Sequence, residues 1–339
     1  MHSIHRIVIL FAGGLAFAAL GACSSGSQHA ADVVPSNIAP LASRYRIVNG
    51  TLGLTSLPGQ TSAAAGWLSD EAKSSRHLLY VSDQPGQTVY IFPEFGKNPK
   101  PIGAITAGIG APEGLFVDQH LNLYVCNFGL ATVTVYPQGK LTPSKTLTQA
   151  GAAAFDVVVG LDSTVYVSNF NEGSNGQIVE YAHGSTTPTT TINFTGYPEG
   201  VALDSHNNLY VAYQKSSTIG TVLKFAPGST TPHDLNLPIT LVGGMTIDNA
   251  NNIIVADQSN PQPHVDVFPP GSKIPSKMYP FALNFNVALN APNDHLYVTQ
   301  PDSPPTVWEI AYPSGTPIQS ITNTISSAFG VATSPEGSR

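Results

Sequence analysis

Short apolar runs alternate with turn-rich segments from about residue 62 to the end of the chain, and one such run returns at a nearly constant interval. Its core is three apolar residues with a tyrosine or isoleucine in the middle. The copies are Leu79-Tyr80-Val81, Leu123-Tyr124-Val125, Val165-Tyr166-Val167, Leu209-Tyr210-Val211, Ile253-Ile254-Val255 and Leu296-Tyr297-Val298. Their centres lie 42 to 44 residues apart. A period in the forties is typical of propeller blades or helical arrays.

A second marker has the same period, and strand chemistry decides between the two architectures. Aromatic residues close an alternating stretch before a Pro/Gly turn at Phe92, Tyr136, Tyr181, Phe225, Phe268 and Tyr312. Each unit contains four short apolar or alternating runs and none of helical period. The 28 prolines and 31 glycines suit turns and not helices. The sequence therefore predicts an all-β protein, a six-bladed β-propeller of four-stranded antiparallel blades.

The two ends of the repeat region predict how the ring closes. Residues 328–333 copy the first strand of a blade, yet no second strand follows them. We expect this segment to supply the innermost strand of the first blade, because a ring has no free edge only if its ends join. The segment from Gly66 to Ser69 is the rival for that position.

The repeated phrase also resembles a known group of propellers. Pro112-Glu113-Gly114 opens a run that ends at Asp118 and is followed by Asn122-Leu123-Tyr124-Val125, and the phrase returns from Pro198 to Val211. This pattern is similar to NHL-repeat propellers and to the propellers of streptogramin lyases and gluconolactonases. The resemblance covers residues 62–339. It implies the blade fold and leaves the function open, because this fold hosts many chemistries.

The first residues predict export and lipid attachment. A weakly basic start precedes an apolar segment, residues 7–20, that is too short to span a membrane. Leu20-Gly21-Ala22-Cys23 resembles a bacterial lipobox, which predicts a signal peptide over residues 1–22 and lipid on Cys23. An ordinary secretory signal with a chance cysteine is the alternative. Residues 23–61 are rich in small and turn-forming residues and predict a flexible tether. The expected location is the cell envelope, at the outer membrane in a diderm host.

Charge and cysteine content exclude some partners. The formal net charge is −7, only 10% of residues are charged, and loss of residues 1–22 removes Arg6 and leaves −8. Nucleic acids require a basic face, so we expect no nucleic-acid partner, and membrane contact through the lipid on Cys23 only. Once Cys23 is assigned to the lipid, Cys126 is left alone and cannot form an intramolecular disulfide. We expect Cys126 to be a buried structural thiol. We also expect the protein to be a monomer.

Candidate chemistry concentrates where the first strand of each blade begins. Familiar catalytic motifs such as G-x-S-x-G and H-E-x-x-H are absent from the sequence. Aligning the six copies puts polar residues Glu113, Asp156, Glu199 and Asn286 at the mouth of the central channel, interleaved with Phe155, Phe285 and Phe329. The ends of the second strands predict another ring at Asp83, Asn127, Asn169, Tyr213, Asp257 and Gln300.

Oxygen ligands of this kind suit a hard cation such as Ca²⁺, the one cofactor that the pattern suggests. The resemblance to gluconolactonases implies a Glu/Asn/Asp metal set, although the order of residues here departs from that family's. The alternative is structural: Glu113 and Glu199 accept hydrogen bonds from neighbouring blades. For Asp118, Asp204 and Asp248 we expect side-chain bonds that fix the turn after the first strand, and for the repeat tyrosines packing between blades.

Three functions remain open from the sequence. We expect a non-enzymatic binding module that presents a mouth or rim to a protein, peptide or glycan, because no catalytic constellation is present. The second is a metal-dependent lactonase-like hydrolase or lyase at the channel mouth. The third is a structural part of the envelope without a small ligand.

Overall fold

The computed structural model describes residues 45–48, 51–54, 65–149, 152–171, 175–216, 218–259, 262–282, 284–301 and 304–334. The predicted signal peptide and Cys23 lie outside these residues. Within the predicted tether, β1 (Tyr45–Val48) pairs with β2 (Thr51–Leu54) as an antiparallel hairpin. In the described residues no helix has the length and apolar character needed to cross a membrane.

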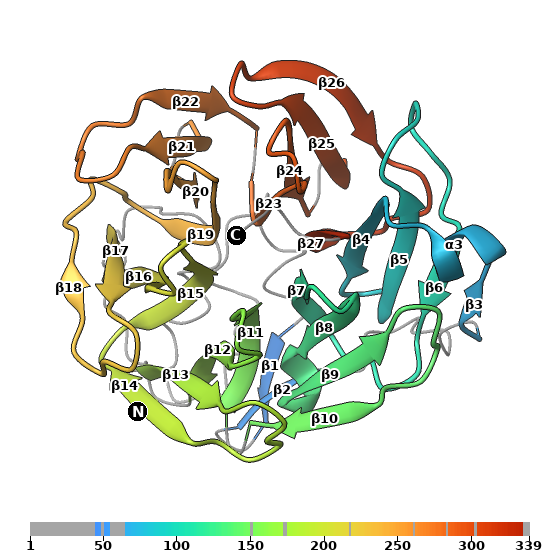
Figure 1. Ribbon diagram of the computed structural model, residues 1–339, viewed down its shortest axis with the longest axis horizontal. Coiled ribbons are helices and arrows are strands. Elements are labelled where there is room, and N and C mark those ends of the chain that lie inside the picture. The colour runs from blue at the N-terminus through green and yellow to red at the C-terminus, as the bar shows by residue number, and fades with distance from the viewer. Residues whose placement is uncertain are drawn as a thin grey trace, which may run out of the picture.

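Six antiparallel sheets form a closed ring, which confirms the predicted propeller (Figure 1). The inner strands are β7 (Pro112–Val117), β11 (Ala152–Val159), β15 (Tyr197–Leu203), β19 (Val242–Ile247), β23 (Val287–Leu289) and β27 (Ala328–Ser334). The second strands are β4 (Leu78–Asp83), β8 (Asn122–Asn127), β12 (Val165–Asn171), β16 (Leu209–Ser216), β20 (Ile253–Asp257) and β24 (His295–Gln300). Each second strand contains one copy of the repeated apolar unit.

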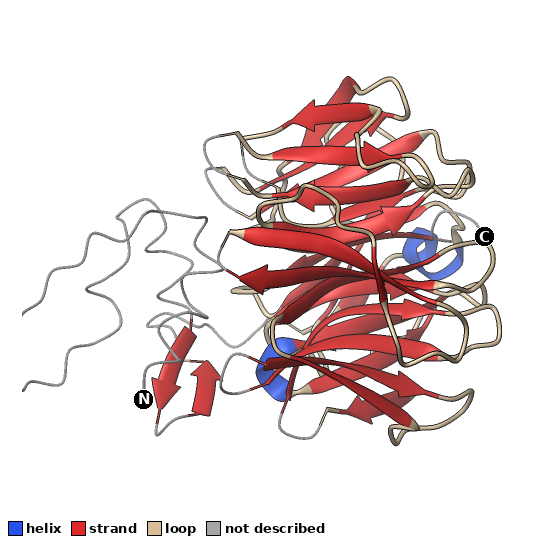
Figure 2. Ribbon diagram, turned by 90° about the vertical axis from the view of Figure 1, so that its left-hand side faces the viewer, coloured by secondary structure: helices blue, strands red, loops and turns tan. Residues whose placement is uncertain are grey.

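The two outer positions complete each blade, and the strands run from one face of the disc to the other (Figure 2). The third strands are β5 (Thr88–Pro93), β9 (Thr132–Pro137), β13 (Asn175–Tyr181), β17 (Ile219–Phe225), β21 (His264–Phe268) and β25 (Thr306–Ala311). The outer strands are β6 (Gly103–Ile105), β10 (Lys145–Thr148), β14 (Thr190–Phe194), β18 (His233–Asp234), β22 (Lys277–Pro280) and β26 (Thr316–Ile321). We number the blades 1 to 6 in the order of their second strands.

The C-terminal strand closes the ring, as predicted. β27 pairs antiparallel with β4 of blade 1, with Ala332 opposite Tyr80 and Ala328 opposite Asp83. The rival segment lies at the opposite edge of the same blade, where β3 (Trp67–Leu68) pairs with β6 as a fifth strand. A short helix, α3 (Asp70–Ser74), follows it and is capped by the Ser69 side chain. The N-terminal segment therefore covers an outer edge, and the C-terminal segment joins the ends of the ring.

Apolar side chains fill the junctions between blades. In the described chain one cluster of buried residues lies at each of the six junctions, and a seventh lies on the axis. Tyr80, Tyr124, Tyr210 and Tyr297 are buried within these junction clusters, which confirms their predicted packing between blades. Burying a large apolar side chain stabilises a fold by about 1.5–3 kcal/mol, so these junctions hold the disc together.

The turns between first and second strands follow the predicted mechanism. Asp204 Oδ1 accepts hydrogen bonds from the backbone N–H groups of His206 and Asn208, each at 2.9 Å. Asp118 and Asp248 make the equivalent pairs of bonds in blades 2 and 5. These bonds allow Asn207 to adopt a left-handed backbone with φ of 58°. We name the face that carries these turns the turn face.

Hydroxyl groups on three second strands tie neighbouring inner strands together. Ser82 Oγ donates to the carbonyl oxygen of Glu113 in blade 2 at 2.7 Å and accepts from Gly330 N in its own blade at 2.6 Å. Ser168 and Thr299 make the same pair of links in blades 3 and 6. Cys126 occupies this position in blade 2, where it is fully buried, and burial raises the pKa of its thiol well above the usual range. It is a structural thiol, as expected.

Candidate functional site

Aromatic rings fill the axis at the face opposite the turns. Phe155 of blade 3, Phe285 before blade 6 and Phe329 of blade 1 come from one column of the repeat and are all buried. The ring centroids of Phe155 and Phe285 lie 5.8 Å apart, and those of Phe285 and Phe329 lie 4.8 Å apart. Phe170 packs on Phe155 at 4.7 Å. We call these four rings the plug, and the face where they lie the plug face.

The two predicted glutamates lie in the protein interior beside the axis. Glu113 and Glu199 are 1% and 5% exposed. Glu113 Oε1 accepts a hydrogen bond from the Gln84 side chain of blade 1. Burial raises the pKa of Glu199 well above its usual range, and the Glu113 carboxylate raises it further. The two side chains therefore interact electrostatically, and both burial and the neighbouring carboxylate favour the protonated form of Glu199.

Asp156 and Asn286 face the axial channel on the turn side of the plug. The channel is narrow, with about 30 Å³ of space, and both side chains border it together with apolar residues of the inner strands. Asp156 Oδ2 accepts from Val201 N of blade 4 at 3.0 Å, and its Oδ1 lies against the backbone of Gly114 in blade 2. Burial raises the Asp156 pKa to about 7. Asn286 Oδ1 accepts from Val287 N at 2.7 Å.

In the described part of the chain, the acidic residues beside the axis, Glu113, Asp156 and Glu199, do not bring their ligand atoms together as a cation site requires. There, a single set of three acidic or histidine side chains brings its ligand atoms within 4.8 Å of one another, and it contains none of Glu113, Asp156 and Glu199. A calcium ion needs six to eight oxygen ligands at 2.3–2.6 Å. The buried carboxylates instead contact blade backbones and the Gln84 amide, a geometry that suits a structural role.

Three members of the predicted second ring, at the ends of the second strands, support the loops that lead into the inner strands. Asp83 Oδ2 accepts from Ser326 N at 2.8 Å, just before β27. Asn127 Oδ1 accepts from Gly110 N at 3.0 Å, just before β7. Asp257 Oδ1 accepts from Leu241 N at 3.3 Å, just before β19. The shared task of these three residues is to satisfy buried backbone donors.

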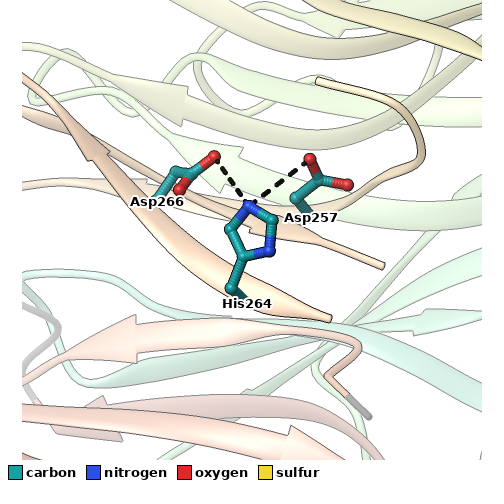
Figure 3. A group of neighbouring side chains, drawn as sticks. All are labelled: Asp257, His264 and Asp266. Atoms are coloured by element: carbon teal, nitrogen blue, oxygen red, sulfur yellow. Dashed lines mark ion pairs between the residues drawn. The ribbon is translucent and has the colours of Figure 1, made fainter. Parts of the chain in front are cut away.

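One member of this ring belongs to a cluster of a different kind (Figure 3). His264 opens β21 directly opposite Asp257, and Asp266 lies two residues further on the same face of the strand. His264 Nε2 is 3.3 Å from Asp266 Oδ2 and 3.8 Å from Asp257 Oδ2. Both carboxylates are 2% exposed, and burial raises the pKa of Asp266. These three residues are the set whose ligand atoms lie within 4.8 Å of one another.

The sequence analysis placed Asp257 in a ring but missed its two partners. The equivalent pairs in the other blades are Thr88/Tyr90, Thr132/Thr134, Gln177/Val179, Thr221/Leu223 and Thr306/Trp308. Only blade 5 has a titratable residue at both of these positions and at the end of its second strand. The available signal was this departure from the repeat, at Asp257, His264 and Asp266.

A groove opens between blades 2 and 3 on the turn face. It holds about 250 Å³ and is lined by Tyr124, Leu147 and Val165 together with polar groups that include Lys145 and His183. This volume is somewhat smaller than that of pockets for drug-sized ligands, which hold about 300–1,000 Å³. Its lining combines an aromatic surface with groups that donate and accept hydrogen bonds.

Comparisons with known proteins assign the fold and no function. No protein-family profile and no curated protein sequence matches the chain. Solved structures do match: a chain of a nidogen/laminin complex is 14% identical with a TM-score of 0.61, covering 76% of this chain and 98% of that chain. Hydrazine synthase of Kuenenia stuttgartiensis is 15% identical with a TM-score of 0.58, covering 82% and 94%. A Bacteroides caccae protein of unknown function is 11% identical with a TM-score of 0.57, covering 76% and 98%. At these identities, the chain shares the propeller fold with them.

Proposed function

We propose that this protein is an exported, lipid-anchored β-propeller of the NHL-like kind that works as a non-enzymatic binding module at the cell envelope. The observation that carries this proposal is the plug, which fills the axis where a lactonase-like propeller would need an open metal site. The polar residues around the axis have structural partners, as Glu113 has with Gln84 and Asp156 with Val201 N. Recognition then falls to the loops and to grooves such as the one between blades 2 and 3, for a peptide or glycan partner.

Lipid attachment has a direct test. Replacing Cys23 with serine should abolish incorporation of labelled fatty acid, because the lipid is carried on the cysteine sulfur. The domain should then move from the membrane fraction to the soluble fraction of cells. Cys126→Ser is the matched control, because Cys126 is buried in blade 2 and should not affect labelling. Labelled fatty acid that persists in the Cys23→Ser protein would show that a residue other than Cys23 carries the lipid.

The alternative function, a metal-dependent hydrolase or lyase, depends on a cation at Glu113, Asp156, Glu199 and Asn286. We expect calorimetry of the purified chain with Ca²⁺ to show no saturable heat at this site, because the carboxylates are buried and do not converge. Thermal melting should not shift with Ca²⁺ for the same reason. Saturable binding that disappears in Glu113→Gln/Glu199→Gln would replace the binding-module proposal with the enzyme.

A further inference from the structure

We propose that Asp257, His264 and Asp266 in blade 5 bind one divalent transition-metal ion of the Zn²⁺ class. The site is separate from the axial carboxylates, and it does not depend on the proposed anchoring or binding role. It lies at the plug-face end of the β20–β21 hairpin, where Asp257 ends one strand and His264 begins the next.

The tautomer of His264 is set by its other ring nitrogen. Nδ1 lies 2.9 Å from the carbonyl oxygen of Gln262. A carbonyl oxygen only accepts hydrogen bonds, so Nδ1 must carry the proton. In the neutral ring Nε2 then presents a lone pair toward the carboxylates of Asp257 and Asp266. A ring N–H donated to a backbone carbonyl, with the other nitrogen facing a metal, is the usual arrangement of histidine ligands.

The distances fit an intervening ion better than a direct hydrogen bond. Charge-assisted N–H···O bonds measure about 2.7–2.9 Å, and O–H donors lie closer still. The two Nε2 to carboxylate distances are 3.3 and 3.8 Å. Ligand atoms about 2.1 Å from a tetrahedral Zn²⁺ lie about 3.4 Å from one another. A hydrogen bond from a protonated His264 or from a protonated aspartate would bring Nε2 closer to the carboxylate oxygens than this. A cation bound between Nε2 and the two carboxylates fits the observed distances better.

The charges and hydrogen bonds of the two carboxylates point the same way. Asp257 accepts backbone hydrogen bonds from Ser259 N at 3.0 Å and Leu241 N at 3.3 Å, which fix the position of its carboxylate group. Asp266 Oδ1 is buried and has no hydrogen-bond partner among the residues that the structure describes. A buried carboxylate oxygen without a partner costs free energy. A divalent cation would balance two carboxylates and supply the missing partner.

Blade 6 offers a contrast within the same chain. His295 also has two acidic neighbours, but each of its ring nitrogens faces a different one: Nδ1 is 2.6 Å from Glu309 Oε1, and Nε2 is 3.7 Å from Asp294 Oδ1. Each ring nitrogen of His295 therefore has its own carboxylate neighbour. At His264 the two carboxylates share one nitrogen. The mixed nitrogen and oxygen donors at His264 suit Zn²⁺ and its neighbours, and Ca²⁺ prefers oxygen alone. Three protein donors leave a fourth position for water or a ligand group.

The test is a Zn²⁺ titration of the purified full-length chain after treatment with a chelator. We expect saturable binding of one Zn²⁺ per chain, and a fall in affinity of at least about 100-fold in both His264→Gln and Asp266→Asn, because the first removes the nitrogen ligand and the second replaces a carboxylate ligand with a neutral amide. The control His295→Gln should bind like the wild type. Co²⁺ in place of Zn²⁺ should give visible absorption bands that disappear in His264→Gln.

Two results would overturn the site. One is a wild-type chain that shows no saturable Zn²⁺ binding. The other is a His264→Gln or Asp266→Asn protein that titrates like the wild type although circular dichroism shows that it is folded. Tighter binding of Ca²⁺ than of Zn²⁺ would overturn the metal class. If calorimetry shows heat of Ca²⁺ binding, its loss in His264→Gln and its retention in Glu113→Gln/Glu199→Gln would assign that binding to the blade 5 site and not to the axial carboxylates.

Discussion

A chain that ends after Ser327 should fail to form a stable propeller, whereas a chain that ends after Ser334 should melt like the full-length protein. The shorter chain lacks β27, all seven residues of which are buried. It leaves the inner edge of β4 unpaired, and it removes Phe329 from the plug and Val331 from the junction of blades 6 and 1. The longer chain keeps every one of these contacts.

The expected loss of stability is of the same order as the whole stability of a domain. Removing a buried Phe costs about 3–5 kcal/mol, and each lost hydrogen bond adds about 1 kcal/mol. The sum for β27 is roughly 10 kcal/mol, against a typical total of 5–15 kcal/mol. Thermal melting followed by circular dichroism measures the effect, and hydrogen exchange of the β4 amides should show that the loss begins at this edge.

A point substitution tests the same closure without shortening the chain. A Cβ on Gly330 would lie 2.1 Å from the carbonyl oxygen of Glu113 in blade 2. Backbone atoms cannot yield to that contact, so Gly330→Ala should push β27 away from its neighbour and lower the melting temperature. If the chain ending after Ser327 and Gly330→Ala both melt within a few degrees of the wild type, the ring is held by other contacts and the closure argument fails.

The fold could be predicted from the sequence because each repeat unit has the same pattern of buried strands and turn-forming residues. Each apolar unit such as Leu209-Tyr210-Val211 must be buried on both faces, which places it on an inner or second strand, and Asp204 marks the turn before it. Closure of the ring by β27 could be predicted because the chain ends with a copy of a first strand that no second strand follows. These are local patterns, and they fix the strands and their order.

The axis and the blade 5 cluster required distances across the ring. Alignment placed Phe155, Phe285 and Phe329 in one column, but only the radius of the ring decides whether such side chains line an open mouth or meet. The pairing of Asp257 with His264 depends on the length and register of one hairpin. Neither quantity can be read from a single sequence, so both the plug and the cluster came from the structure.

Unfolding experiments should find the protein more stable at pH 5 than at pH 8. Burial raises the pKa of Asp156 from 3.8 to about 7 and raises that of Glu199 further above its usual range. Below pH 3.8 both states hold the Asp156 proton. Between pH 3.8 and about 7 the unfolded chain loses this proton while the folded chain keeps it, so stability falls as pH rises and levels off above pH 7. For Asp156 alone, the loss between pH 5 and pH 8 is about 2–3 kcal/mol.

Other carboxylates do not cancel this trend in that window. The pKa values of Asp204 and Asp234 are lowered, despite partial burial, by hydrogen bonds to Asn208 and Lys215 respectively, so these groups lose stabilising energy only as pH falls below about 4. Urea unfolding at pH 5 and pH 8 measures the effect. Asp156→Asn keeps an acceptor for Val201 N but cannot ionise, so its stability should change less with pH, whereas the exposed control Asp162→Asn should behave like the wild type. A wild type that gains stability from pH 5 to pH 8, or an Asp156→Asn protein with an unchanged pH dependence, would mean that the axial carboxyl is ionised in the folded protein. In that case a cation near Asp156 would again be a reasonable explanation for how that charge is held in the interior.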